Sequence, residues 1–220
     1  MYRYKGDEIE EQSMNIIESE IGYEHKGRYS EYEWLIVRRV IHATADYDFA
    51  YSYSDNALVF TDHAVESALY SIRNRAAIVA DTDIIYAALN KSMLSRLSLQ
   101  CICRISEKEV IDEARRLDKT RAQVAMRLSS KYIDGGIVAI GNAPTALYEL
   151  IEMIREGIRP GFIIALPVGF VSAKESKLAL MELGKSTPVE YVTNKGRKGG
   201  STAAASILNA LFKICSNEVR

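Results

Sequence analysis

The segment GIVAIGNAPTALYEL, residues 136–150, contains the pattern on which the fold is built. A short apolar run ends in a Gly-Asn pair, and Pro144 then stands where a first-turn proline would begin a helix. A short apolar run bounded by turn residues is typical of a buried strand. The segment therefore predicts a strand that leads directly into a helix.

The same pattern recurs along the chain. Further short apolar runs occupy 76–81, 99–104, 161–166 and 189–193. Amphipathic patterns that predict helices lie near 83–90, 106–130, 144–157, 173–183 and 201–215. The segment 106–130 could form two helices separated by a break at 117–119. Strands that alternate with helices indicate a mostly parallel sheet covered by helices on both faces. We therefore predict an α/β fold with a roughly five-stranded sheet.

The first 75 residues show helical patterns only. Apolar residues at roughly helical spacing among acids predict an amphipathic helix over 7–21. Ser30 and Glu33 form a capping-box pattern before a second helix, and Thr61 is a candidate N-cap for a third. Because no repeat, low-complexity tract or linker divides the chain, we predict one domain over 1–220, with an N-terminal helical extension (1–75) and an α/β part (76–220).

The composition is that of an ordinary globular protein. The 220 residues are 48% apolar and 26% charged, and 28 basic against 29 acidic residues give a net charge of -1. This balance does not indicate a nucleic-acid partner, and no apolar run approaches the ~20 residues that a membrane helix needs. The start is too acidic for a signal peptide. Three cysteines without metal-binding spacing fit a reducing compartment, so we predict a cytoplasmic protein.

Ligands of open α/β sheets bind beyond the carboxyl ends of the strands, which directs attention to 81–83, 141–147, 166–177 and 193–201. Asn142 could cap a helix or offer its amide to a ligand, and alone the turn favours the structural role. The stretch GRKGGS (196–201) combines glycines and cations before an alanine-rich helix, which favours an anion. It lacks phosphate-loop spacing, so a nucleotide site is not indicated.

One histidine stands out in RRVIHATAD, residues 38–46. On a helix, Arg38 and Arg39 share a face with His42 and would disfavour its protonated form, whereas Asp46 one turn further on would favour it. Histidine is the side chain best suited to moving a proton at neutral pH. From the residues alone, a helix-end histidine that binds the last carbonyls is an equally good interpretation. The tyrosine-rich loop that follows (46–56) could stack against a flat ligand or form a mobile flap.

Taken together, the sequence resembles the precorrin-8X methylmutase family, also called cobalt-precorrin-8 methylmutase, of cobalamin synthesis. The matching segments occur in the family's order: SMNIIESE (13–20), RRVIHATAD (38–46), DTD (81–83), KTRAQVAM (119–126), AIGNAPTALYEL (139–150), PVGFVSAKESK (167–177) and GRKGGSTAAASILNAL (196–211). Ala88 and Ser172 stand where the family usually has glycine.

The resemblance implies an α/β isomerase that acts as a homodimer, with corrinoid sites near the subunit interface. Its reaction moves a methyl group from C-11 to C-12 of a precorrin-8-type macrocycle, giving cobyrinate in the cobalt-containing route or hydrogenobyrinate in the metal-free route. The resemblance implies no cofactor and no enzyme-bound metal. His42 matches the catalytic histidine, as proton donor and acceptor, and Ser13 and Arg39 match substrate-contacting positions.

The other candidate substrate-binding residues follow from the carboxylate rim of such a macrocycle. Cations, backbone N–H groups and neutral hydrogen-bonding side chains at the strand ends suit it. The candidates are Asp81, Thr82, Arg121, Asn142, Thr145, Arg197, Lys198, Gly199, Gly200 and Ser201. A non-catalytic corrinoid-binding or carrier protein is the main alternative, and a nucleotide-dependent enzyme is disfavoured. Whether the substrate contains cobalt is left open.

Overall fold

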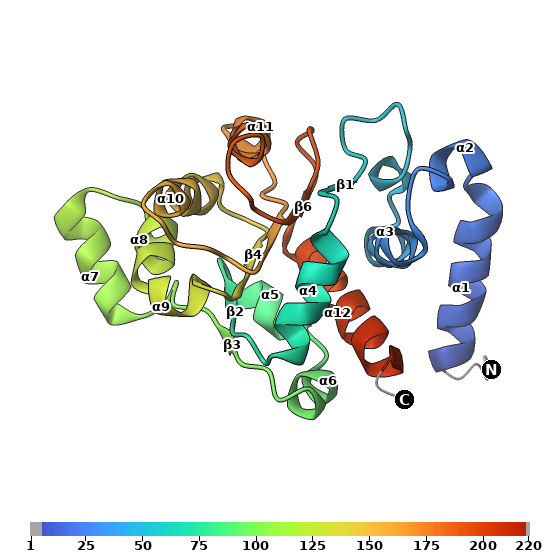
Figure 1. Cartoon of the computed structure of the whole chain (residues 1–220), viewed down its shortest axis with the longest axis horizontal. Coiled ribbons are helices and arrows are strands. Elements are labelled where there is room, and N and C mark those ends of the chain that lie inside the picture. Colours follow the sequence, from blue (N-terminus) through green and yellow to red (C-terminus); the bar gives the residue numbers. More distant parts are fainter. Residues whose placement is uncertain (1–5, 219–220) are drawn as a thin grey trace, which may run out of the picture.

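The computed structural model describes residues 6–218, so the first five residues of the acidic start and the last two of the chain lie outside it. A six-stranded sheet with the order β1-β6-β5-β4-β2-β3 forms its centre (Figure 1). The strands are β1 (Val59–Phe60), β2 (Ile78–Ala80), β3 (Cys101–Ile102), β4 (Ile137–Ile140), β5 (Phe162–Ala165) and β6 (Tyr191–Thr193). All neighbours pair in parallel except β1 and β6. The mostly parallel sheet and its five predicted strands are confirmed.

The sixth strand, β1, was not predicted. It is two residues long, lies at the edge of the sheet and pairs Val59 with Thr193 in the antiparallel direction. It lies between helices and outside the alternation of strands and helices that indicated the other five strands. The N-terminal part therefore supplies an edge strand as well as helices.

Helices cover both faces of the sheet, as predicted. Alternate residues of a strand point to opposite faces, so Ile137 and Ala139 of β4 enter one core while Val138 and Ile140 enter the other. The first core is completed by α1 (Gly6–Glu20), α3 (Glu31–Thr44), α4 (Ala64–Arg73), α5 (Asp83–Ala88), α6 (Lys91–Arg96) and α12 (Ser201–Glu218). The second is completed by α8 (Arg121–Leu128), α9 (Ser130–Ile133), α10 (Pro144–Arg155) and α11 (Ala173–Gly184). Three remaining elements are α2 (Tyr23–Lys26), the 3-10 helix η1 (Tyr47–Phe49) and α7 (Lys108–Leu117).

Helix α12 lies between the sheet and the N-terminal helices (Figure 1). Ala203, Ala204 and Ala205 in its first turns are buried, as are Leu208 and Phe212 further along. Small side chains allow neighbouring elements to approach closely, and α3 packs along the side of α12 that the sheet leaves open. Because α3 carries His42, this packing decides where the histidine lies.

Most predicted helix boundaries agree with the structure. The capping box of α3 is present, since Ser30 Oγ accepts from the Glu33 N–H and the Glu33 carboxylate accepts from the Ser30 N–H. The break at 117–119 is also present, with Asp118 in the left-handed conformation (φ 51°) between α7 and α8. Thr61 as an N-cap was wrong. Helix α4 begins at Ala64, and the Thr61 hydroxyl instead donates to the Glu190 carboxylate, which ties β1 to the segment before β6.

None of the helices within residues 6–218 combines the length and apolar character that crossing a bilayer requires.

The end of β4 touches the start of α12 at Gly141. A Cβ placed on Gly141 would lie 2.7 Å from Ser201 Cα and 2.8 Å from its nitrogen, far inside van der Waals contact with backbone that has no room to move. Only glycine therefore fits where the strand meets the helix.

We expect Gly141→Ala to lower the free energy of unfolding by about 1–3 kcal/mol, because an added methyl group forces a well-packed region apart. Gly6→Ala is the matched control, since a Cβ there meets nothing within 4 Å. Denaturant unfolding of both variants checks this. A Gly141→Ala protein as stable as the control would contradict the close contact.

Candidate functional site

The carboxyl ends of β2 and β4 are joined by a buried carboxylate. Asp81 directly follows β2 and is 3% exposed. Its Oδ1 accepts from the Gly141 N–H (3.0 Å), and its Oδ2 accepts from the N–H groups of Asn142 (2.8 Å) and Ala143 (2.7 Å). Burial raises the pKa of Asp81, and these backbone hydrogen bonds oppose the rise. Its carboxylate thus shapes the turn into α10, and a direct contact of Asp81 with substrate stays a prediction.

Four predicted polar contacts lie around this turn. Thr82 caps α5, its hydroxyl accepting from the Ile84 N–H at 3.3 Å. The Thr145 hydroxyl accepts from that of Thr120 at 3.0 Å, which brings the start of α8 against the start of α10. Arg121, the first residue of α8, and Asn142 are both exposed at this edge. A contact of any of these four residues with substrate stays a prediction.

We call residues 194–200, between β6 and α12, the glycine loop. A Cβ on Gly199 would lie 2.2 Å from the Leu166 carbonyl oxygen, and Gly200 has a φ of +117°, so both positions require glycine. The Gly200 N–H donates to that same Leu166 carbonyl at 2.9 Å. Ser201 then opens α12, whose first N–H groups have no partners within the helix and favour an anion. The glycine loop therefore lies against the end of β5, with the start of α12 beside Gly141.

Two cations of the glycine loop have different surroundings. Lys198 forms ion pairs with Asp46 (2.7 Å) and Asp48 (2.8 Å), and hydrogen bonds to these carboxylates raise its pKa. Arg197 is exposed and lies over the ring of Phe170, 5.7 Å from its centroid. The tyrosine-rich loop thus anchors the glycine loop through acids, a role that the sequence did not indicate.

The tyrosines of that loop pack mainly on one another. Tyr51 and Tyr53 stack with 5.2 Å between ring centroids, and both contact His25 edge-on. Stacking of this cluster against a flat ligand stays a prediction.

His42 lies in the last turn of α3 and is partly buried. Burial lowers its pKa, the neighbouring Arg39 lowers it further, and Glu10 opposes both. Arg39 itself forms an ion pair with Glu10 at 3.2 Å. The imidazole of His42 is therefore biased towards the neutral form at neutral pH, which is the form that accepts a proton.

Two neighbours of His42 differ from the expectation. Asp46 was expected one helical turn beyond His42, but α3 ends at Thr44 and Ala45 turns left-handed (φ 53°), so Asp46 leaves the helix and pairs with Lys198. Arg38 does not tune the imidazole, since it pairs with Glu18 at 2.9 Å. Asp46 instead links the C-terminal end of α3 to the glycine loop.

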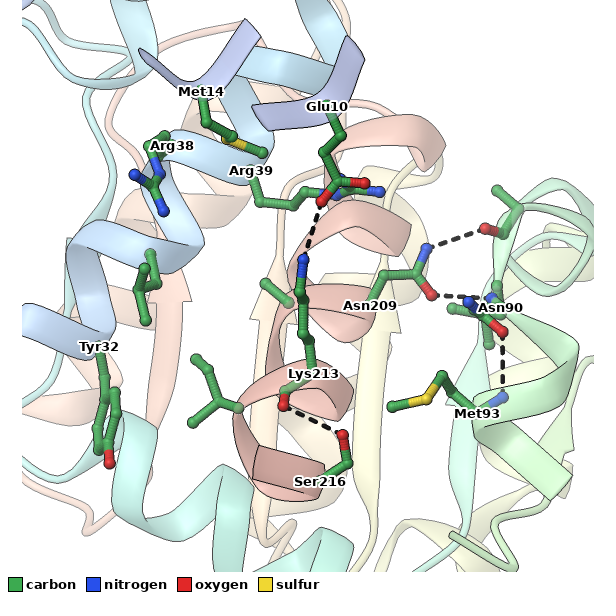
Figure 2. Close-up of a pocket in the computed structure, with 15 residues that line it drawn as sticks. Glu10, Met14, Tyr32, Arg38, Arg39, Asn90, Met93, Asn209, Lys213 and Ser216 are labelled. Carbon is green, nitrogen blue, oxygen red and sulfur yellow. Dashed lines mark hydrogen bonds and ion pairs between the residues drawn. The ribbon is translucent and has the colours of Figure 1, made fainter. Parts of the chain in front are cut away.

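A cavity of about 790 Å³ runs along α12 between α1, α3 and the α5–α6 region (Figure 2). Arg38 and Arg39 of α3, Glu10 of α1 and Lys213 of α12 supply its charges. Glu10 binds Lys213 at 3.0 Å as well as Arg39, so this acid joins cations of two helices (Figure 2). The rest of the wall is largely apolar, with Met14, Leu35, Ala88, Leu89, Met93, Ala210 and Ile214. His42 follows Arg39 by one turn; it is not among the lining residues, but two that are, Arg39 and Glu10, act on its pKa.

Ser13 lies on α1 next to the cavity wall. It precedes Met14 of the cavity wall on α1, but its hydroxyl donates to the Ile9 carbonyl at 2.8 Å within the helix. A contact of Ser13 with substrate therefore stays a prediction.

Several residues of this region were not found from the sequence. Glu10 and Lys213 lie outside every quoted motif, and Asn209 lies inside the quoted segment 196–211 without having been singled out. The packing of α1, α3 and α12 against one another brings these three residues to one place. Lys177, on α11, lay inside the quoted segment 167–177, and its position after a strand was the only signal.

An α/β sheet with anion-favouring loops at its carboxyl edge, and a histidine of lowered pKa beside a large cavity lined by cations, is typical of an enzyme that moves protons on an anionic small molecule. A family model described as precorrin-8X methylmutase matches residues 8–214. The chain belongs to the precorrin-8X methylmutase family.

Individual relatives agree over nearly the whole chain. Cobalt-precorrin-8 methylmutase of Priestia megaterium is 42% identical over 96% of this chain and 89% of its own length. That of Leptospira interrogans is 39% identical over 96% of this chain and 94% of its own. The crystal structure of precorrin-8X methylmutase from Thermus thermophilus, 38% identical, superposes with a TM-score of 0.86 and covers 97% of this chain and 98% of that one.

These findings confirm the predicted family, fold class and reaction class: the chain is an isomerase of cobalamin biosynthesis. The alternative of a non-catalytic carrier is not favoured by them.

We expect Arg39→Gln to raise the pKa of His42, because it removes the neighbouring cation and leaves Glu10 to favour the protonated form. Glu10→Gln should lower that pKa for the opposite reason. Proton NMR titration of the ring checks both, since the chain has only three histidines to assign. An unchanged or lowered value in Arg39→Gln would contradict the coupling.

Proposed function

We propose that this chain moves a methyl group from C-11 to C-12 of a precorrin-8-type macrocycle, with His42 as the group that gives and takes the proton. The observation that carries the proposal is the position of His42, one turn beyond Arg39 on α3. Arg39 lines a cavity large enough for much of a tetrapyrrole-derived ring. Protonation makes a conjugated ring poorer in electrons and so eases migration of the methyl group. The same imidazole then removes a proton to give the new tautomer, so no net proton is consumed.

The lowered pKa of His42 favours the first step. The imidazolium form protonates the ring and is a stronger acid than an unperturbed imidazolium, and the neutral imidazole that this leaves behind then removes a proton from the rearranged ring. Arg39 contributes to this by its charge, and Glu10 limits how far the pKa falls.

The surroundings match the substrate's chemistry. The apolar part of the cavity suits the flat face of the macrocycle, and Arg38, Arg39 and Lys213 suit carboxylates at its rim. On the other side of His42, Lys198 and the start of α12 offer a second group of anion partners. We therefore place the ring at the end of the cavity nearest His42, with carboxylates reaching towards both groups.

We further propose that the protein acts as a homodimer. The family resemblance supports this, and so do apolar side chains left exposed on α1 and α5, such as Ile16 (53% exposed) and Ile84 (61% exposed). Sedimentation equilibrium of the purified chain tests it, and a monomer at micromolar concentration would refute it.

We propose a cobalt-containing substrate and a cytoplasmic location. Both curated relatives compared above are named cobalt-precorrin-8 methylmutases. Supplying metal-free and cobalt-containing precorrin-8 separately, and following the visible spectrum, decides between the two routes. Cell fractionation tests the location, which fits Cys101 and Cys103, neither of which forms a disulfide.

His42→Ala should lower turnover by about 10²- to 10⁴-fold, the usual contribution of general acid–base catalysis, while the corrinoid still binds. His63→Ala, an exposed histidine at the start of α4, is the control and should behave as wild type. Turnover is followed with substrate in excess over sites. Near-normal turnover by His42→Ala would remove His42 from this role, and wild-type product limited to one equivalent per site would favour a carrier.

A further inference from the structure

Lys177 of α11 is completely buried, at 0% exposed, and its side chain points into the glycine loop. Its Nζ donates to Asn194 Oδ1 at 2.7 Å, to the Gly196 carbonyl at 2.9 Å and to the Lys198 carbonyl at 2.8 Å. A single nitrogen therefore binds three alternate residues of one loop.

This geometry requires the charged form of the lysine. Three acceptors need three N–H donors, and only the ammonium group has them. A neutral amine would have two donors and would turn its lone pair towards the third oxygen. Burial opposes the charge and lowers the pKa of Lys177 to about 7.

No carboxylate balances this charge within residues 6–218. Of the nearby acids, Asp55 pairs with Lys174, and Asp46 and Asp48 pair with Lys198. Glu175, on the same helix, acts instead on Tyr148, and no acid in the described part of the chain offsets the effect of burial on the pKa of Lys177. The remaining charged groups of the loop itself, Lys195 and Arg197, are cations. All three partners of the Lys177 ammonium are neutral oxygens, so its positive charge remains available to an anion bound on the loop.

We infer that Lys177 is a positioning residue of the substrate site, which fixes the glycine loop and strengthens its hold on a carboxylate of the macrocycle. The inference rests on the proposed function, because it takes that carboxylate to belong to the precorrin. Lys177 acts through the loop: it does not itself touch the substrate.

An uncompensated buried charge is costly, so it is best explained by an anion that completes it in the working complex. Binding and protonation are then linked in both directions. A carboxylate on the loop raises the affinity of Lys177 for its proton, and protonation of Lys177 raises the affinity for the carboxylate by the same factor. As the pH rises above about 7, the free enzyme loses the proton and the loop loses its third hydrogen bond, so substrate should bind more weakly.

Asn194→Asp is the sharpest test. It is nearly isosteric and places a carboxylate 2.7 Å from the lysine nitrogen, which neutralises the charge and keeps Lys177 bound, although it removes the 3.1 Å hydrogen bond from Asn194 Nδ2 to the Lys198 carbonyl. We expect KM for precorrin-8 to rise about tenfold, the loss expected for one charge-assisted interaction, with kcat changed far less. Lys177 should stay protonated in this variant, so the rise of KM above pH 7 should disappear.

Asn74→Asp, an exposed position at the end of α4, adds the same charge away from the loop and is the control. Lys177→Met removes both the charge and the three hydrogen bonds, and should raise KM and speed amide hydrogen exchange over 194–201. Lys185→Met, exposed near the end of α11, is its control.

The outcomes separate the two proposals. If wild type converts precorrin-8 and Asn194→Asp keeps the wild-type KM and pH profile, Lys177 is only structural and the inference is overturned while the proposed function stands. If wild type does not convert either form of precorrin-8, the proposed function fails. Absorbance titration with hydrogenobyrinate then decides the inference: weaker binding by Asn194→Asp than by Asn74→Asp supports it, and equal or absent binding overturns it.

Discussion

The structure depends most on the need to bury α12 from two sides. An apolar helix after the last strand cannot be covered by the sheet alone, because a sheet meets only one side of a cylinder. The alanines of its first turns let a neighbouring helix approach closely, and α3 occupies that position with Val37, Val40 and Ile41 buried. The C-terminal end of α3 is thereby brought near the start of α12, where the glycine loop ends. Packing of the hydrophobic core thus brings the C-terminal end of α3, in the first quarter of the chain, near the glycine loop, in its last eighth, where Asp46 pairs with Lys198.

Acidic residues organise the cations around this position. Glu10 binds Arg39 and Lys213 on the cavity side, and Asp46 and Asp48 bind Lys198 on the loop side. Long basic side chains lose considerable conformational freedom when they are ordered, so cations already held by acids meet an incoming carboxylate at a lower entropic cost. Lys177 differs from all of them, because hydrogen bonds to neutral oxygens order it and its charge is left uncompensated.

Local patterns were enough to predict most of the fold. The five parallel strands and the long helices follow from apolar runs and turn residues, and the capping box at Ser30 marked the start of α3 correctly. Strand β1 was missed because it lies among helices and joins the sheet antiparallel, outside the alternation of strands and helices that marked the others. The site was less predictable. His42 and Arg39 share one helix, so their contact follows from helical spacing, but the partnership of Arg39 with Glu10 depends on how two helices pack. The prediction that Asp46 lies one helical turn beyond His42 was wrong because one left-handed residue, Ala45, ends the helix before it.

The two departures from the family's usual glycines have different physical consequences. Ser172 has a φ of 63°, in the left-handed region that glycine adopts freely, so a side chain here is tolerated at some cost in backbone strain. This explains a preference for glycine without any reference to substrate. Ala88 ends α5 with ordinary helical geometry and lines the cavity, where its carbonyl accepts from Asn209 at 3.0 Å. A methyl group in place of hydrogen narrows the cavity opposite α12 but leaves the backbone unstrained. Of the two substitutions, Ala88 is therefore the one that changes the shape of the cavity, and Ser172 affects the stability of the turn before α11.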